Sequence, residues 1–397
     1  MTTKQKELVF LAAKRTPFGG FGGTLKDVNP SDLGTSAAKA SLAQAGVDPK
    51  EIQHVIVGSV LQSTSDSIYT ARHIGLKAGV PIEVPALAIN RLCGSGFQVL
   101  VEAQHQMWAD DTQVALVGGV ENMSLTPYVL RSTRWGTRLG HGQVEDYLYA
   151  ALTDSYCGCP MAITAENLGA KYNITRQMVD EFALLSQTRT KEATAKGVFK
   201  DEIAPYSIVD KKGNATVVDK DEHPKPETTI EILTKLKPVF KENGLVTAGN
   251  ASGIVDGASM MVVSTAEYAK NKNLKPLGRL VSYGIAGVDP NIMGIGPVPA
   301  SRIALKKAGM TMAQMDLVEV NEAFAAQYLS VEKELELDRT RTNVSGGAIA
   351  IGHPLAASGT RIVSHLLYEL KRRGKRYGLG SACIGGGQGI AVIVEVF

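Results

Sequence analysis

Short apolar runs alternate along this chain with longer amphipathic stretches, which is the pattern of strands connected by helices. The first third carries three apolar runs and two helical stretches, at residues 8–12, 32–45, 54–60, 93–107 and 114–118. Because strands and helices alternate, we predict an α/β fold in which mixed sheets are flanked by helices.

The same order of elements returns in the last third of the chain. Its elements fall at residues 280–286, 300–308, 317–320, 358–372, 377–381 and 390–396. A shift of 263 residues (359 minus 96) places Gly359 on Gly96, Ser358 on Ser95 and Leu355 on Leu92. One constant shift across helices, strands and turns indicates an internal repeat. We therefore expect two halves related by a pseudo-twofold axis: residues 1–121, completed by about 250–270, and residues 271–397.

Residues 122–249 have no counterpart at this shift. They contain a polar helical stretch at 164–196 and a run rich in Pro, Lys and Asp at 210–241. We predict that they form an inserted loop domain that holds the substrate above a rigid scaffold.

Composition narrows the class of protein. The 397 residues are 44% hydrophobic and 20% charged, with 41 glycines, which is typical of a globular enzyme rather than a disordered chain. A net charge of +3 gives no reason to expect nucleic acid or an anionic membrane as partner. The N-terminal residues 1–6 carry no signal-peptide core, and no apolar run is long enough for membrane insertion. We expect a cytoplasmic protein, or one imported into an organelle with an uncleaved signal.

Cysteine is the first candidate for chemistry. The four cysteines form neither a disulfide framework nor a CxxC metal pair, so we expect no metal site. Cys93 stands in a glycine-rich turn after the apolar run 84–89 and before a helix. A helix N-terminus favours an anion, so we expect this position to increase the thiolate fraction of Cys93. The alternative from the residues alone is a small buried hydrophobic side chain.

The repeat predicts where other polar groups meet Cys93. The 263-residue shift places Asn90 on His353 and Val120 on Cys383, so both should lie at the seam between the halves. Asn321 follows the apolar run 317–320, and ligands bind at such strand ends in α/β sheets. Each has a plain alternative: a structural histidine, a hairpin turn or a helix cap.

Four stretches together resemble the thiolase family. They are Asn90-Arg91-Leu92-Cys93-Gly94-Ser95-Gly96, Asn321-Glu322-Ala323-Phe324, Gly352-His353-Pro354 and Cys383-Ile384-Gly385-Gly386-Gly387. The resemblance covers essentially the whole chain and is greatest to the degradative 3-ketoacyl-CoA thiolases of the mitochondrial type. It implies the thiolase fold, and an address in the mitochondrial matrix if the source is eukaryotic.

The resemblance implies a role for each motif residue. Cys93 resembles the nucleophile that takes the acyl group, and His353 the residue that activates it. Cys383 resembles the general acid and base for the enolate. Asn321 resembles the residue that holds a water in the first oxyanion hole, and the N–H groups of Cys93 and Gly385 resemble the second hole.

The reaction that this resemblance implies is the CoA-dependent cleavage of 3-ketoacyl-CoA to acetyl-CoA and a shortened acyl-CoA. It proceeds through an acyl-cysteine and reverses as a Claisen condensation. Coenzyme A would be a cosubstrate, with no tightly bound cofactor. The alternative is an acetoacetyl-CoA thiolase that condenses two acetyl-CoA in biosynthesis. Those enzymes usually carry His-Met-Gly where this chain has Pro160-Met161-Ala162, which favours broader acyl chains.

Lys225, Thr228 and Ser252 align with CoA-contacting positions of the family. Relatives often have Arg where this chain has Lys225, and lysine stacks less well on an adenine. The family also implies a homodimer or homotetramer. Two rivals are a ketoacyl synthase-type condensing enzyme, which would use Cys with two His or with His and Asn, and a non-catalytic protein of this fold. The second would be expected to have lost Cys93, His353 or Cys383.

Overall fold

The computed structural model describes residues 6–209 and 212–397. Two sequence predictions fall partly outside the described residues. Residues 1–5 belong to the N-terminal stretch used to predict the compartment, and residues 210–211 belong to the run rich in Pro, Lys and Asp. The central sheet is built from β1 (Leu8–Arg15), β3 (His54–Gly58), β4 (Ala86–Ile89), β5 (Val114–Glu121), β12 (Val255–Thr265), β13 (Gly278–Gly287), β14 (Leu317–Val320), β15 (Tyr377–Ile384) and β16 (Gln388–Val396), with the short β2 (Gly19–Gly20) paired to β12.

The order of strands repeats between the halves. In the first half β4, β3 and β5 are parallel neighbours, and β12 and β1 follow in antiparallel pairing. In the second half β14 and β15 are parallel, and β16 and β13 follow in antiparallel pairing. A short antiparallel pairing of Val9 with Arg279 joins the halves. The predicted α/β fold with mixed sheets is confirmed.

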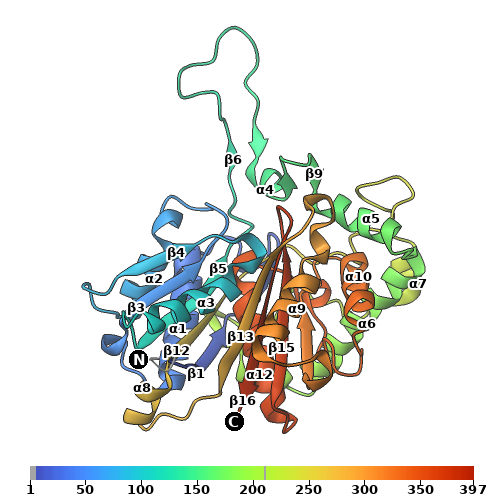
Figure 1. Ribbon diagram of the computed structural model, residues 1–397. Helices are drawn as coiled ribbons and strands as arrows, with labels where there is room; N and C mark the ends of the chain where they lie inside the picture. The colour runs from blue at the N-terminus through green and yellow to red at the C-terminus, as the bar shows by residue number, and fades with distance from the viewer. Residues whose placement is uncertain (1–5, 210–211) are drawn as a thin grey trace.

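Helices pack on both faces of the sheet (Figure 1). They are α1 (Pro30–Ala45), α2 (Thr70–Ala78), α3 (Ser95–Trp108), α8 (Ala266–Asn271), α9 (Pro297–Ala308), α10 (Ala325–Leu335), α11 (Ala348–Ile351) and α12 (Ser358–Arg372). Of these, α3 and α12 contact one another between the two halves. One of the two largest apolar clusters lies around α3 and α12, with Phe97, Leu100, Ile362 and Leu366 among its buried members. Burial of such side chains supplies most of the stability of a domain, at about 1.5–3 kcal/mol each.

The two helices at the centre cross at Gly96 and Gly359, the pair that the repeat superposes. A Cβ on Gly96 would lie 2.7 Å from the backbone nitrogen of Thr360, and one on Gly359 would lie 2.3 Å from that of Phe97. Only glycine permits this approach of two backbones. The pseudo-twofold axis expected from the sequence therefore passes near this contact.

The segment 122–249 adds small elements on one side of this scaffold. They are β6 (Tyr128–Val129), β7 (Glu145–Asp146), α4 (Tyr147–Ala151), β8 (Thr153–Asp154), β9 (Cys159–Pro160), α5 (Met161–Lys171), α6 (Arg176–Ala195), β10 (Tyr206–Val209), β11 (Ala215–Val218) and α7 (Ile230–Thr234). Residues 130–144 between β6 and β7 extend from the body as an exposed arm, at the top of Figure 1.

The helical stretch predicted at 164–196 is two helices rather than one. Asn173 adopts the left-handed conformation (φ 52°), which ends α5, and the Thr175 side chain accepts the Met178 N–H at the start of α6. A left-handed asparagine and a threonine N-cap commonly mark the end of one helix and the start of the next. The pattern of polar residues is continuous across 164–196, so it did not predict this break.

Candidate active site

The Cys93 turn is held by side chains on either side of it. The carboxamide of Asn90 accepts the Leu92 N–H (3.0 Å), and the Ser95 hydroxyl accepts the Arg91 N–H (2.9 Å) and donates to the Leu92 carbonyl (2.8 Å). Leu92 has φ 47°, in the left-handed region that a branched side chain rarely adopts. Such strain persists only where the surroundings fix it, and it commonly marks a functional turn. Here it presents Cys93 at the start of α3.

The expected increase in the thiolate fraction of Cys93 is wrong for the resting enzyme. Burial raises the pKa of the Cys93 thiol to about 11, although the N–H of Gly385 and its own N–H act in the opposite direction. The cost of desolvating a thiolate therefore exceeds the benefit of the helix N-terminus. At neutral pH the sulfur carries its proton.

His353 follows Gly352, whose φ of 92° requires glycine. Its Nδ1 lies 2.5 Å from the Ser358 hydroxyl, which lies 3.3 Å from the Pro354 carbonyl, and its Nε2 lies 3.3 Å from Nδ2 of Asn321. Because an amide nitrogen can only donate, this network places the imidazole proton on Nδ1 and the lone pair on Nε2. Burial, with the nearby Arg361 cation, lowers the pKa of His353 to about 3. The ring is therefore neutral and can accept a proton.

Asn321 and Cys383 lie at adjacent strand ends. The Asn321 N–H donates to the Ser381 carbonyl (2.9 Å), which joins the end of β14 to β15. The Oδ1 atom of Asn321 is buried without a hydrogen-bond partner among the described residues. Cys383 is fully buried, and both burial and the neighbouring Cys93 raise the pKa of its thiol.

Cys93, His353, Cys383 and Ser252 line one cavity of about 290 Å³. Asn321 and Gly385 join this group through their contacts with His353 and Cys93. The remaining walls are largely apolar and include Met123, Tyr149, Leu152, Met161, Phe240, Met293, Phe324 and Leu355. A mostly apolar cavity with a few convergent polar groups is the usual form of a substrate site.

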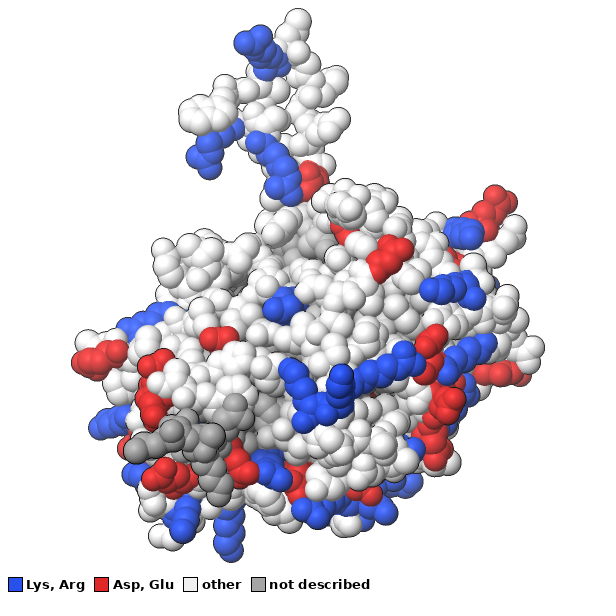
Figure 2. Space-filling view, in the orientation of Figure 1, with Lys and Arg blue, Asp and Glu red and all other residues white. Residues whose placement is uncertain are grey.

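The other two predicted CoA contacts do not line this cavity. Lys225 is exposed, and the Thr228 hydroxyl donates to the Lys225 carbonyl (2.7 Å) in a turn of the inserted segment. On the face shown in Figure 2, basic and acidic side chains are interspersed over the body of the molecule. No groups of three or more His, Cys, Asp or Glu that could hold a metal occur within residues 6–209 and 212–397.

Glu322 supports the site without lining its cavity, and the sequence alone predicted no role for it. Its buried carboxylate accepts from the Ser186 hydroxyl (2.7 Å), Asn343 Nδ2 (2.9 Å) and the Ile349 N–H (3.1 Å). It therefore links the end of β14 to α6 and to α11, which precedes His353. The residue stands inside the Asn321-Glu322-Ala323-Phe324 motif, but only the fold brings its partners together.

Two family profiles match nearly the whole chain: "Thiolase, N-terminal domain" over residues 8–267 and "Thiolase, C-terminal domain" over residues 274–396. The chain belongs to the thiolase family. It is an acyltransferase of that family, so the resemblance drawn from its motifs is confirmed.

Individual relatives agree. The chain is 55% identical to the mitochondrial 3-ketoacyl-CoA thiolase of Bos taurus over 97% of each chain, and 47% identical to a beta-ketothiolase of Cupriavidus necator over 98% of this chain and 99% of the relative. The crystal structure of human mitochondrial 3-ketoacyl-CoA thiolase superposes with a TM-score of 0.97 at 54% identity over 100% of both chains. A complex of the human enzyme with CoA superposes with a TM-score of 0.96 at 53% identity over 99% of this chain and 98% of that one.

Proposed function

We propose that this thiolase cleaves 3-ketoacyl-CoA with coenzyme A, giving acetyl-CoA and an acyl-CoA shortened by two carbons. The observation that carries the proposal is the convergence of two thiols and a neutral imidazole, Cys93, Cys383 and His353, on one apolar cavity. Carbon–carbon cleavage needs a nucleophile for the keto carbon and an acid for the departing enolate, and these side chains supply both.

In the first step the Cys93 sulfur attacks the keto carbon while its proton passes to Nε2 of His353. The two groups start neutral, because burial disfavours both the thiolate and the imidazolium. The tetrahedral oxyanion lies within reach of the N–H groups of Cys93 and Gly385. Losing one such donor typically costs about 100- to 1000-fold in rate.

In the second step the bond between the keto carbon and the α-carbon breaks, and Cys383 protonates the α-carbon of the acetyl-CoA enolate. The unpartnered Oδ1 of Asn321 supports its assignment as the holder of a water in the enolate oxyanion hole, because a buried acceptor needs a donor. The thiol of CoA then attacks the acyl-Cys93 carbonyl and gives its proton to the Cys383 thiolate. The Cys93 sulfur leaves as the acyl group passes to CoA, and it takes back the proton held by Nε2 of His353. In the reverse direction the same groups carry out the condensation.

We also propose that residues 122–249 form a domain that binds CoA. It would lie between a first half, residues 1–121 completed by about 250–270, and a second half, residues 271–397. The segment contributes Tyr149, Leu152, Met161 and Phe240 to the cavity. Lys225, Thr228 and Ser252 would contact CoA, a cosubstrate released in each turnover. A Lys225→Ala variant should raise the KM for CoA, and an unchanged KM would remove Lys225 from the site.

The test of function is thiolysis of 3-ketoacyl-CoAs of increasing chain length, with Cys93→Ser as the inactive control. We expect rates on longer chains at least comparable to those on acetoacetyl-CoA, because the cavity wall is apolar. A sharp preference for the four-carbon substrate would favour the acetoacetyl-CoA synthesis alternative. Folded protein that cleaves none of them would refute the mechanism.

We propose a homodimer or homotetramer, as the family implies. Within residues 6–209 and 212–397 the structure contains no helix that is both long and apolar enough to cross a bilayer. The mammalian relatives are named as mitochondrial, which supports the matrix as the address in a eukaryote and leaves the cytoplasm for a bacterial source.

A further inference from the structure

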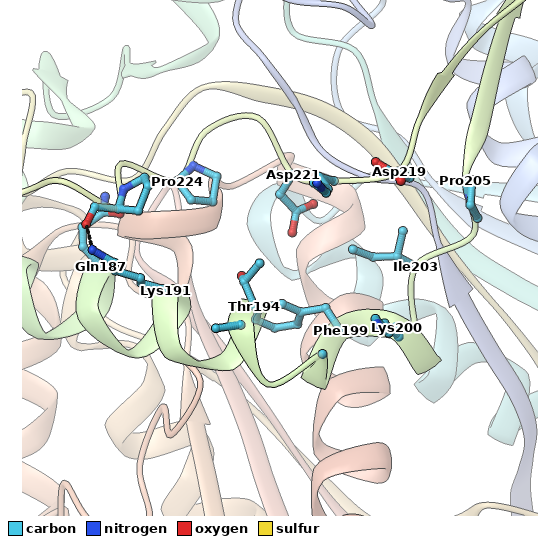
Figure 3. A pocket seen from close by; sticks show the side chains of 14 residues that line it. Gln187, Lys191, Thr194, Phe199, Lys200, Ile203, Pro205, Asp219, Asp221 and Pro224 are labelled. Carbon is cyan, nitrogen blue, oxygen red and sulfur yellow. Dashed lines mark hydrogen bonds between the residues drawn. The ribbon is translucent and has the colours of Figure 1, made fainter.

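The segment that carries Lys225 and Thr228 runs between two cavities. Pro224 and Pro226 line a cavity of about 680 Å³ together with residues of α6, as Figure 3 shows for Pro224. On the opposite side, His223 contacts Gly253, which lines the catalytic cavity. The stretch 223–226 therefore borders the larger cavity through its two prolines and packs toward the catalytic cavity through the His223 ring.

Several side-chain contacts hold this stretch and its approach in place, among them those of Asp221, Lys225 and His223. Asp221 accepts from the buried Arg15 guanidinium at 2.6 and 2.9 Å, and Gln187 Oε1 accepts the Lys225 N–H (2.9 Å). The third is Nδ1 of His223, 2.9 Å from the Ala350 carbonyl in α11. Only this third contact reaches the turn that carries His353.

The His223 ring occupies the space next to Gly253 that a side chain at position 253 would need. A Cβ on Gly253 would lie 2.1 Å from Nε2 of the ring, so the imidazole can take this position only because residue 253 is glycine. The Gly253 carbonyl accepts the His353 N–H (2.9 Å), and Ala350 lies three residues before His353. The contacts thus form a closed circuit from His223 to Ala350, His353, Gly253 and back.

We propose that His223 is a positioning residue of this thiolase: its imidazole fixes the CoA-contacting segment and the catalytic His353 relative to one another. The CoA half of this inference rests on the proposed function. Because a carbonyl can only accept, Nδ1 of His223 carries the proton. Burial lowers the pKa of His223, so the ring stays neutral near pH 7 and keeps this donor.

The test compares substitutions that keep or remove the donor. Asparagine places an amide nitrogen where Nδ1 stands, whereas glutamine and alanine do not. We expect His223→Ala and His223→Gln to raise the KM for CoA about fivefold, the loss of one hydrogen bond. They should also lower kcat about 10- to 100-fold, because small misplacements of catalytic groups cost rate. His223→Asn should stay within about threefold of the parent in both, and His141→Ala, in the exposed arm, is the matched control.

A second readout needs no CoA. The rate at which iodoacetamide alkylates Cys93, followed by peptide mass spectrometry, should fall at least fivefold in His223→Ala and recover in His223→Asn. This measurement tests the link to His353 even if the parent cleaves no 3-ketoacyl-CoA, so the two proposals fail separately. A lower melting temperature with kcat, KM and alkylation unchanged would overturn the inference, and so would His223→Asn behaving like His223→Ala.

Discussion

The nucleophile illustrates how burial outweighs local placement. Cys93 stands at the start of a helix with the Gly385 N–H against its sulfur, yet its pKa is raised to about 11. His353 has its pKa lowered to about 3 by the same cause. Both shifts favour the neutral pair near pH 7, so at that pH we expect the thiolate to form as the proton moves to the imidazole.

This pair predicts the pH dependence of Cys93 alkylation in the absence of substrate. Only the thiolate reacts, and it gains about tenfold per pH unit below its pKa. The rate of iodoacetamide alkylation should therefore keep rising beyond pH 9, with no plateau near the ordinary cysteine value of about 8.5. Peptide mass spectrometry separates Cys93 from the other thiols, and Cys93→Ser is the blank. A plateau below pH 8 would contradict the neutral resting pair.

Loss of Asn321 tests the oxyanion assignment at the same scale. Asn321→Ala removes the amide beside Nε2 of His353 and should lower kcat about 100- to 1000-fold, with a smaller change in KM. Steady-state thiolysis measures both. The control is Asn291→Ala, because Asn291 is exposed. Asn343 is unsuitable as a control because its side chain donates to Glu322. A loss below threefold would leave Asn321 as a strand-end cap.

At the scale of elements, the backbones of α3 and α12 approach closely at Gly96 and Gly359, two positions that the repeat superposes. Gly96 and Gly359 admit this crossing because neither has a Cβ. Both helices begin directly after turns that carry reactive residues, Cys93 and His353. The distance between those turns therefore depends on how closely the helices pack.

Gly359→Ala should destabilise the protein by about 1–3 kcal/mol, the usual cost of overpacking, because the new methyl meets the Phe97 backbone at 2.3 Å. Urea unfolding measures the change. Gly142→Ala is the matched control, since a Cβ there meets nothing within 4 Å. A change for Gly359→Ala within 0.5 kcal/mol of parent, roughly the range of neutral surface substitutions, would show that the crossing can relax.

A buried ionic group joins the inserted segment to the scaffold. Glu202 pairs with Arg15 of β1 (3.1 Å) and with His365 of α12 (3.2 Å), and all three side chains are buried. Burial alone would raise the pKa of Glu202, but Arg15 and His365 lower it to about 2. The same carboxylate raises the pKa of His365.

A carboxylate with a depressed pKa stabilises the fold above its unfolded value and loses that contribution as pH falls. The unfolded value is 4.5, so the Glu202 contribution should be complete above about pH 5 and decline toward pH 2. Glu202→Gln should cost about 3–5 kcal/mol at pH 7, as for other broken buried pairs, and less at pH 3. Urea unfolding at several pH values measures this, with exposed Glu242→Gln as control. A pH-independent difference would exclude the linkage.

At the scale of the whole molecule, β4 is the last strand of the sheet, and one of its edges is unpaired among the described residues. Leu87 on this strand is 37% exposed, in a protein whose other central strands are largely buried. An open edge with apolar side chains favours association. We expect a solution mass of two or four times 42.2 kDa by light scattering, reduced by Leu87→Lys. A single 42.2 kDa species at micromolar concentration would contradict the expected oligomer.

The sequence by itself determined the elements, the repeat and the family. Periodic apolar positions are local, so most strands of the scaffold and its helices α1, α3, α9 and α12 could be predicted within a few residues, whereas α2 and α10 were not predicted. The motif around Cys93, His353 and Cys383 could be recognised because each stretch is contiguous. The constant shift between the halves even predicted that these three would meet at one seam, where they now line one cavity.

Only the tertiary structure decided the charge states and the supporting contacts. The pKa of Cys93 depends on how much water and apolar surface surround it, which no local pattern contains. Glu322 and His223 act through partners more than 20 and 100 residues away, at Asn343 and Ala350. Such contacts arise where distant segments pack, so side-chain burial and long-range hydrogen bonds become known only once the chain is folded.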